Sequence, residues 1–142
     1  MKNLFFLTLL ALSVLFTGCA SSTQQSEPPS INISKDVPLS RIKSAIIDTG
    51  MATGWQLERE SDYLMTFVKE NTNMLVGALF HTNYDIRVFN RASFVITDSG
   101  NYYTLRMSMA IVSNYGSPLE KSESVRAKNV AETFEKIEAK LR

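Results

Sequence analysis

The sequence predicts an α+β fold, in which an antiparallel sheet of about four strands carries an N-terminal and a C-terminal helix as a two-layer sandwich. Three observations favour this fold. Residues 86–111 alternate apolar and polar side chains around a turn sequence, which is typical of a β-hairpin. Residues 39–49 and 130–141 place apolar side chains at helical spacing. A sheet with one apolar face needs helices to cover that face.

The first helix is expected from Pro38 to about Ala52. Proline is tolerated in the first turn of a helix, and Asp36 or Ser40 can cap the free amides there. Gly54 follows the last apolar position and is a natural left-handed terminator. The segment is therefore bounded at both ends by residues that suit helix termini.

Shorter strands are expected on both sides of this helix. Ile31 and Ile33 alternate with polar neighbours and indicate a short edge strand. Residues 55–58 alternate in the same way, which predicts a strand with one wet face. Residues 63–68 are apolar at both parities after a turn at 61–62, so we expect both faces of that strand to be covered.

The hairpin strands are joined by residues 98–101, whose Asp, Ser, Gly and Asn are typical turn residues. With the tip at 99–100, Phe94 lies opposite Leu105 and every apolar residue meets an apolar residue on one face. A slip of one residue would break that match. Arg91 and Arg106 then lie on the other face, where arginines can bind carboxylate or phosphate. Ion pairs with nearby acidic residues are the favoured interpretation of these two side chains.

The final helix is expected to start between Ser117 and Ser124. Residues 117–120, Ser-Pro-Leu-Glu, resemble a capping box with proline in the first turn. Its apolar stripe consists of Val130, Phe134, Ile137 and Leu141.

Residues 74–80 form an apolar run that the two-layer plan does not use. Polar segments at 71–73 and 81–83 bracket the run, which favours a short helix or flap that closes over the sheet edge. Part of its surface would then be left for a partner or the membrane. A further central strand is the alternative, because periodicity cannot separate strand from helix in so short a run. The possible interaction surface consists of Met74, Leu75, Leu79, Phe80, Arg91 and Arg106.

The N-terminus has the features of a secretory signal. One positive charge at Lys2 precedes an apolar run, residues 4–16, that is shorter than the roughly 20 residues needed to cross a bilayer as a helix. Small residues, Thr17 and Gly18, follow the run, as signal peptidases require. Cys19 comes next and is the only cysteine in the chain.

Residues 16–19, Phe-Thr-Gly-Cys, resemble the lipobox of bacterial lipoprotein precursors, although leucine is usual where Phe16 stands. The resemblance implies cleavage between Gly18 and Cys19, with acyl groups such as palmitate added to Cys19. Ala20 follows the cysteine, whereas aspartate there favours inner-membrane retention in enterobacterial-type lipoproteins. The resemblance therefore implies an anchor in the outer membrane with the protein on the periplasmic face.

The expected organisation is a signal peptide at 1–18, a lipidated cysteine with a flexible tether at 19–30, and one α+β domain at 31–142. The tether is polar and ends in two prolines, which is typical of a disordered linker. The order of elements from Pro38 to Leu141 also resembles the small periplasmic domains of lipoproteins in the outer-membrane barrel-assembly machine.

Catalytic and metal-binding patterns are not found in the sequence. His81 is the only histidine, and with no second histidine and no free cysteine it cannot build a usual zinc site. There is no Gly-x-Ser-x-Gly elbow and no glycine-rich phosphate loop. Glu58, Glu60 and Asp62 cluster, but a solvated strand face is the favoured interpretation over a catalytic carboxylate pair. We therefore predict no enzyme activity, no cofactor and no metal.

The charge is nearly balanced, with 15 Lys and Arg against 14 Asp and Glu, so no long-range attraction for nucleic acid is expected. The sequence predicts a non-catalytic interaction or assembly module of the cell envelope. Its expected partners are the membrane, through the acyl chains on Cys19, and another envelope protein. The alternative is a carrier or binder of a small apolar ligand held between helix and sheet.

Overall fold

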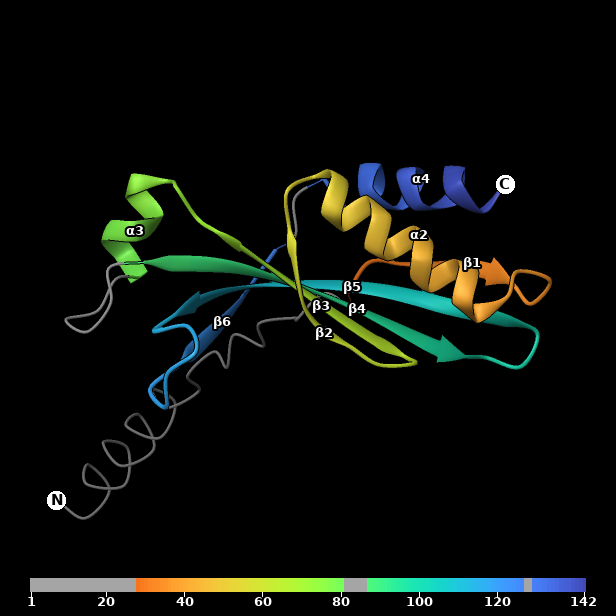
Figure 1. Cartoon of the computed structure of the whole chain (residues 1–142), viewed down its shortest axis with the longest axis horizontal. Coiled ribbons are helices and arrows are strands. Elements are labelled where there is room, and N and C mark those ends of the chain that lie inside the picture. Colours follow the sequence, from red (N-terminus) through yellow and green to blue (C-terminus); the bar gives the residue numbers. More distant parts are fainter. Residues whose placement is uncertain (1–27, 81–86, 127–128) are drawn as a thin grey trace, which may run out of the picture.

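The computed structural model describes residues 28–80, 87–126 and 129–142 (Figure 1). The predicted signal, Cys19 and most of the predicted tether lie outside the described residues, and so does His81. The first described strand begins at Ser30, one residue before the predicted start of the domain.

The described residues form one six-stranded sheet in which all neighbouring strands are antiparallel. The strand order is β1-β5-β4-β3-β2, and β6 also pairs with β5. β1 pairs with residues 102–106 of β5 and β6 with residues 109–113, so the two short strands share one edge of β5. The strands are β1 (Ser30–Ser34), β2 (Gln56–Glu60), β3 (Leu64–Glu70), β4 (Val88–Asp98), β5 (Tyr102–Ser113) and β6 (Lys121–Val125).

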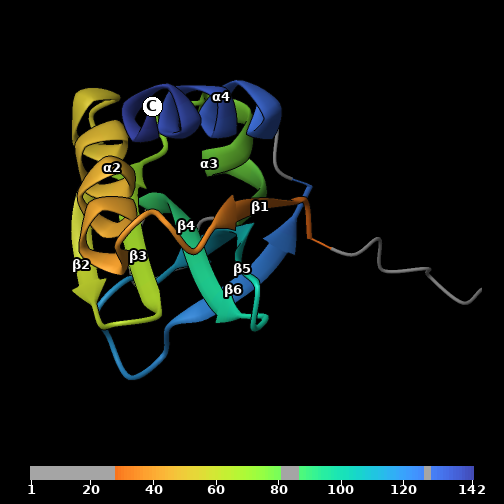
Figure 2. The same ribbon diagram turned by 90° about the vertical axis from the view of Figure 1, so that its right-hand side faces the viewer.

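Three helices accompany the sheet in the described part of the chain: α2 (Leu39–Ala52), α3 (Met74–Phe80) and α4 (Val130–Leu141). α2 and α4 lie side by side over one face of the sheet, whereas α3 stands apart near one end of the sheet (Figures 1 and 2). The predicted α+β class and the antiparallel sheet are confirmed. The prediction of about four strands in a simple two-layer sandwich is wrong, because β1 and β6 extend the sheet and a third helix lies outside the α2–α4 layer.

The core lies between α2, α4 and the sheet. Phe67 of β3 and Phe94 of β4 meet edge to face, with ring centroids 5.8 Å apart. A Cβ atom on Gly50 would approach the Phe67 ring to 2.7 Å, so glycine at this position lets α2 pack closely on β3. The same core cluster contains the fully buried side chains of Ile42, Ile46, Met65, Leu105 and Ile137.

α2 has the predicted length but not the predicted N-cap. Pro38 occupies the N-cap position, and no side chain there caps a backbone amide. Asp36 instead accepts a 2.8 Å hydrogen bond from the Ser34 hydroxyl and closes the turn before the helix. Ser40 makes no cap either, so this part of the prediction is wrong. Gly54 has a φ of +79°, which confirms it as the left-handed residue after the helix.

The hairpin of β4 and β5 has the predicted faces but a different register. Phe94 lies opposite Met107, not Leu105, so the pairing is shifted by two residues. The cause is the turn: Ser99 N donates to Tyr102 O at 3.0 Å, which places the two-residue loop at 100–101. Gly100 has a φ of +81°, as the first central residue of a type II′ turn requires. A shift of two keeps each side chain on its face, so Phe94 and Leu105 are still both buried.

The final helix starts later than predicted, because residues 121–125 form β6 and α4 begins at Val130. The side chains of β6 are mostly exposed and polar, so no alternating pattern marks the strand in the sequence. Residues 117–120 form a turn and not a capping box: the Ser117 hydroxyl donates to Asn114 O at 2.8 Å. The predicted stripe is confirmed, with Val130, Phe134 and Ile137 buried and Leu141 packed against the core.

Candidate functional site

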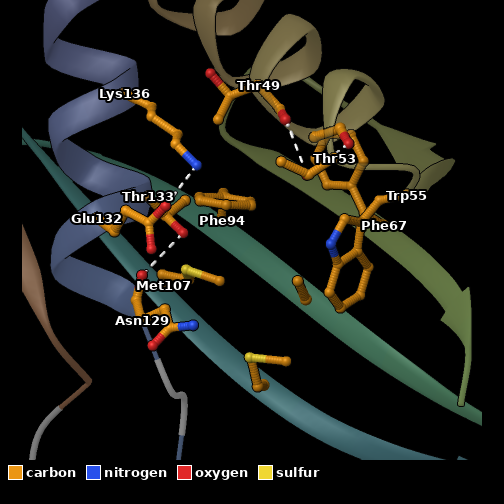
Figure 3. A pocket seen from close by; sticks show the side chains of 13 residues that line it. Thr49, Thr53, Trp55, Phe67, Phe94, Met107, Asn129, Glu132, Thr133 and Lys136 are labelled. Carbon is orange, nitrogen blue, oxygen red and sulfur yellow. Dashed lines mark hydrogen bonds and ion pairs between the residues drawn. The ribbon is translucent and has the colours of Figure 1, made fainter.

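A cavity of about 260 Å³ lies between α2, α4 and the helix-covered face of the sheet (Figure 3). The apolar part of its lining consists of Trp55, Phe67, Ala92, Phe94, Met107 and Met109. The polar part comes from the last turn of α2 and the first two turns of α4, and its side chains are Thr49, Thr53, Asn129, Glu132, Thr133 and Lys136. An apolar interior with a polar side toward two helix ends suits a molecule with a hydrocarbon body and a polar head.

The threonine hydroxyls around this cavity donate hydrogen bonds to backbone carbonyls one helical turn earlier in the chain. Thr49 donates to Ala45 O at 2.7 Å, and Thr53 donates to Thr49 O at 3.0 Å. The Thr133 hydroxyl donates to Asn129 O at 3.1 Å. In the described part of the chain, no buried side-chain nitrogen or oxygen lacks a hydrogen-bond partner. The hydroxyl protons of these three threonines are therefore already engaged and are not free to bind a polar ligand.

Two opposite charges stand at the α4 side of the cavity. Lys136 Nζ lies 2.7 Å from Glu132 Oε1, an i,i+4 pair whose side chains are 50% and 59% exposed. The hydrogen bond from Lys136 lowers the pKa of Glu132 below its ordinary value. The pair thus holds a cation and an anion at the mouth of an apolar cavity, both within reach of water.

α3 confirms the predicted short helix in the apolar run and excludes the alternative strand. Its first turn is fixed by asparagines: Leu75 N donates to Asn73 Oδ1 at 3.0 Å, and Asn71 Nδ2 donates to Asn90 Oδ1 of β4 at 2.9 Å. Leu75 and Leu79 are 76% and 78% exposed, and the helix contains no charged residue. Phe80 is half-buried. α3 therefore exposes an apolar face that contains no charged side chain, and this face is called the bare apolar face of α3.

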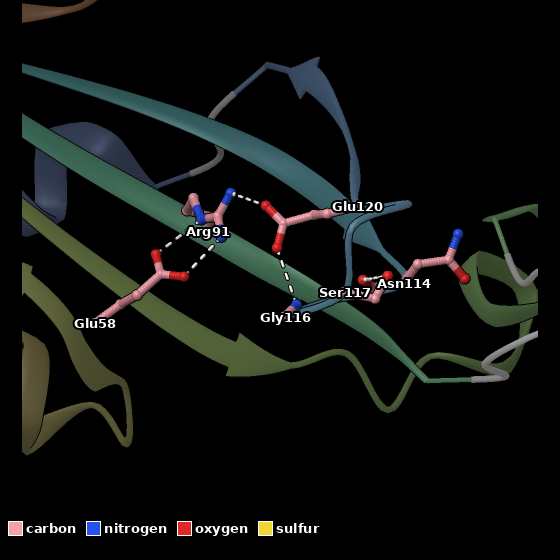
Figure 4. Close-up of polar contacts among 6 residues, drawn as sticks. All are labelled: Glu58, Arg91, Asn114, Gly116, Ser117 and Glu120. Atoms are coloured by element: carbon pink, nitrogen blue, oxygen red, sulfur yellow. Dashed lines mark hydrogen bonds and ion pairs between the residues drawn. The ribbon is translucent and has the colours of Figure 1, made fainter.

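Arg91 lies on the sheet face opposite to α2 and α4, and it is held there by two acidic side chains (Figure 4). Its Nε and Nη2 donate to the two Glu58 oxygens at 2.9 and 2.6 Å, and Nη1 donates to Glu120 Oε1 at 2.8 Å. Partial burial alone would lower the pKa of Arg91, but the bonds to Glu58 and Glu120 raise it above its ordinary value. Arg91 is thus engaged within the fold, whereas Arg106 is exposed.

The acidic cluster at the end of β2 divides between the two sheet faces. Glu58 binds Arg91, while Glu60 lies 2.9 Å from Lys43 Nζ of α2. Asp62 is 3.7 Å from the same lysine. A register shift between Leu57 and Arg59 accompanies this division. Glu58 is therefore paired with Arg91, whereas Glu60 and Asp62 share Lys43.

Sequence reasoning placed a possible ligand between helix and sheet but named none of the residues around the cavity. The α4 contribution has a recognisable signal, because Asn129, Glu132, Thr133 and Lys136 follow the i, i+3, i+4, i+7 spacing of one helix face. Trp55 gives no such signal. It comes from the link between α2 and β2, and only the packing of those elements brings it to the cavity.

Comparison with protein-family models finds no match to the chain, and comparison with curated proteins finds no significant match. Within the described residues, no helix is long and apolar enough to span a bilayer. Over the same residues, no three His, Cys, Asp or Glu side chains gather as a metal site would require. Two features of the described structure are open to a partner or ligand: the face of α3 and the cavity beside α4.

Proposed function

We propose that this chain is a lipoprotein anchored in the outer membrane through acyl groups on Cys19, and that it acts at the periplasmic face as a non-catalytic interaction module. The lipobox-like segment at 16–19 supports the anchor. The observation that carries the interaction role is the bare apolar face of α3, with Leu75 and Leu79 more than three-quarters exposed.

The two leucines are one helical turn apart and therefore lie on the same face of α3. Fully burying a leucine side chain is worth about 1.5–3 kcal/mol, so a partner that covers both gains several kcal/mol from them. An exposed apolar helix face of this kind can bind in an apolar groove of another protein, where the side chains at positions i and i+4 insert as anchors. The partner in this proposal is a protein that offers such a groove.

The position of the fold relative to the anchor restricts where that partner can be. The backbone of Pro29 is the first to join the sheet, through a 3.2 Å bond from Met107 N to Pro29 O. Pro29 is ten residues after Cys19, and ten residues extend to roughly 35 Å at most. An acylated Cys19 would thus keep the folded domain near the membrane surface, and the partner is expected to be a membrane protein or another anchored protein.

A pair of leucine substitutions tests this role. Leu79→Asp should leave the free energy of unfolding within about 0.5–1 kcal/mol of wild type, because the side chain is mostly exposed and only helix propensity changes. The same variant should lose its crosslinked partner in the native membrane. Leu119→Asp is the matched control, since Leu119 is 53% exposed and lies in the segment between β5 and β6, outside α3.

The readout is crosslinking and pull-down from the protein's own membrane, with chemical denaturation of each purified variant. Loss of the partner with Leu79→Asp and retention with Leu119→Asp is the expected result. An identical set of crosslinked proteins for wild type and Leu79→Asp would contradict the role of α3. Unfolding of Leu79→Asp without a separate binding defect would contradict it too.

The alternative function, a binder of a small apolar ligand, is supported by a different observation. The cavity between α2, α4 and the sheet has an apolar lining of aromatic and methionine side chains. It lies beside α2 and α4, whereas α3 stands apart from them (Figure 1). The two functions are therefore compatible in one molecule.

A further inference from the structure

We propose that the cavity between α2, α4 and the sheet binds the hydrocarbon chain of a single-chain amphiphile whose anionic head lies at Lys136. This proposal rests on the alternative function, ligand binding in the same cavity, and is independent of the role proposed for α3. It rests on the lining of the cavity, on the state of its polar groups and on the charge pair at its mouth.

The interior selects a hydrocarbon body. Its sheet side consists of aromatic rings and the thioethers of Met107 and Met109, which adapt to irregular apolar shapes. The hydroxyls of Thr49, Thr53 and Thr133 are already bonded to backbone carbonyls. A sugar or nucleotide would bury many polar groups against these rings and thioethers and would keep only part of its hydrogen bonding, which is unfavourable.

The size of the cavity restricts the ligand to one chain. An apolar cavity of about 150 Å³ already accommodates benzene, so about 260 Å³ accommodates a longer apolar group. Typical sites for drug-sized ligands begin at about 300 Å³, so a two-chain lipid is too large to be enclosed. A fatty acid or another single-chain amphiphile of medium length fits this range.

The head group is assigned by the charges at the mouth. Lys136 and Glu132 are the two charged side chains in the lining, and both are about half exposed. An anionic head can accept a hydrogen bond from Lys136 Nζ, where it competes with the Glu132 carboxylate 2.7 Å away. The polar end therefore stays in water while the chain enters the apolar interior.

The acyl chain has two possible sources. Met107 lines the cavity, and its backbone amide binds Pro29 O at 3.2 Å, where the chain from Cys19 joins the sheet. An acyl group on Cys19 is one source, and this possibility rests on the proposed lipidation. A free amphiphile from the membrane is the other source, and it needs no lipidation.

Trp55 makes the test direct, because it lines the cavity and is the only tryptophan in the chain. The probe is decanoic acid, added to the mature chain carrying Cys19→Ser, which is purified without detergent. We expect a saturable blue shift of Trp55 emission, together with displacement of bound N-phenylnaphthylamine. Absence of both signals would overturn the proposal.

Two substitutions locate the binding in the cavity from opposite sides. Ala92→Met fills it from β4 and Thr133→Phe fills it from α4, and each should weaken decanoic acid binding by roughly tenfold. Thr133 is only half-buried, so Thr133→Phe is the variant less prone to unfolding, and circular dichroism checks both. Wild-type affinity in a folded Thr133→Phe protein would overturn the assignment to this cavity.

The head group has its own matched pair of variants. Lys136→Gln should weaken decanoic acid binding by roughly two- to fivefold, as expected for a half-exposed ion pair. Lys140 lies one turn further along α4, outside the lining, so Lys140→Gln should leave decanoic acid binding unchanged. Glu132→Gln should tighten binding, because it removes the competing carboxylate. Equal effects of Lys136→Gln and Lys140→Gln would overturn the assignment of the head to Lys136.

The acylated wild-type protein in phospholipid vesicles identifies the source. If the acyl chain on Cys19 fills the cavity, Trp55 emission is already blue-shifted and decanoic acid has no further effect, whereas the Cys19→Ser protein responds. If the source is a free amphiphile, both proteins respond alike. Either result supports the cavity as an acyl-chain site. If Cys19 is not lipidated, the wild-type protein will not attach to the membrane, but the decanoic acid titration of the Cys19→Ser protein will be unchanged. The lipidation proposal and the cavity proposal can therefore be refuted separately.

Discussion

Arg91→Met removes the guanidinium that joins β2, β4 and the segment before β6 on the sheet face opposite to α2 and α4. Glu58 and Glu120 would then lose three charged hydrogen bonds of 2.6–2.9 Å. Their side chains are only 22% and 28% exposed, so water compensates them in part. Exposed ion pairs contribute about 0.2–1 kcal/mol, and breaking buried ones costs about 3–5 kcal/mol. For this intermediate site we expect a loss of about 2 kcal/mol.

The assay is urea denaturation at neutral pH, with Arg106→Met as the matched control. Arg106 lies on the same sheet face in β5 and is exposed, so its replacement should change the free energy of unfolding by less than about 0.5 kcal/mol. Equal destabilisation by the two variants would refute the reasoning, because it would show that the Arg91 pairs add nothing beyond an ordinary surface arginine.

The same site predicts a dependence of stability on pH. The hydrogen bond from Arg91, with a further bond from Gly116 N, lowers the pKa of Glu120 below its ordinary value. A carboxyl with a depressed pKa in the folded state contributes stability above its unfolded pKa of about 4.3, and this stability is lost as the pH falls through the folded value. Arg91→Met should therefore flatten the fall in stability below about pH 4.3. A wild-type acid profile in that variant would contradict the pairing with Glu120.

Three further predictions concern the core and the anchor. Leu105→Ala should cost about 2–5 kcal/mol in urea denaturation, because the side chain is fully buried, and a cost below about 1 kcal/mol would contradict its place in the core. Gly50→Ala should destabilise the fold by about 1–3 kcal/mol, because the new Cβ would approach the Phe67 ring to 2.7 Å. Gly77→Ala has open space at its Cβ and should stabilise the fold by about 0.5–1 kcal/mol. Thermal denaturation should show a lower melting temperature for Gly50→Ala and a higher one for Gly77→Ala. Cys19→Ser should move the protein from the membrane fraction to the soluble periplasmic fraction, and retention in the membrane would contradict lipid anchoring.

The sequence by itself determined the type and the faces of the long elements. The 3.6-residue spacing predicts α2 and the buried stripe of α4, and alternation predicts most of the buried side chains of β4 and β5. Thr104 and Val112 are exceptions, because they are buried although they have the opposite parity to Leu105. The polar residues around the apolar run at 74–80 were enough to favour α3 as a helix. These features are local, because each depends on residues within a few positions of one another.

Only the tertiary structure decided the features that depend on residues far apart in the chain. β6 is a polar strand that pairs with the part of the β5 edge not used by β1, and no alternating pattern within residues 121–125 predicts that pairing. The pairing of Arg91 with Glu58 and Glu120 joins residues about 30 positions apart. The cavity likewise needs α4, the end of α2 and the middle of the sheet at once. Periodicity fixes which way a side chain points within its element, but neighbours across space are fixed by how the elements pack.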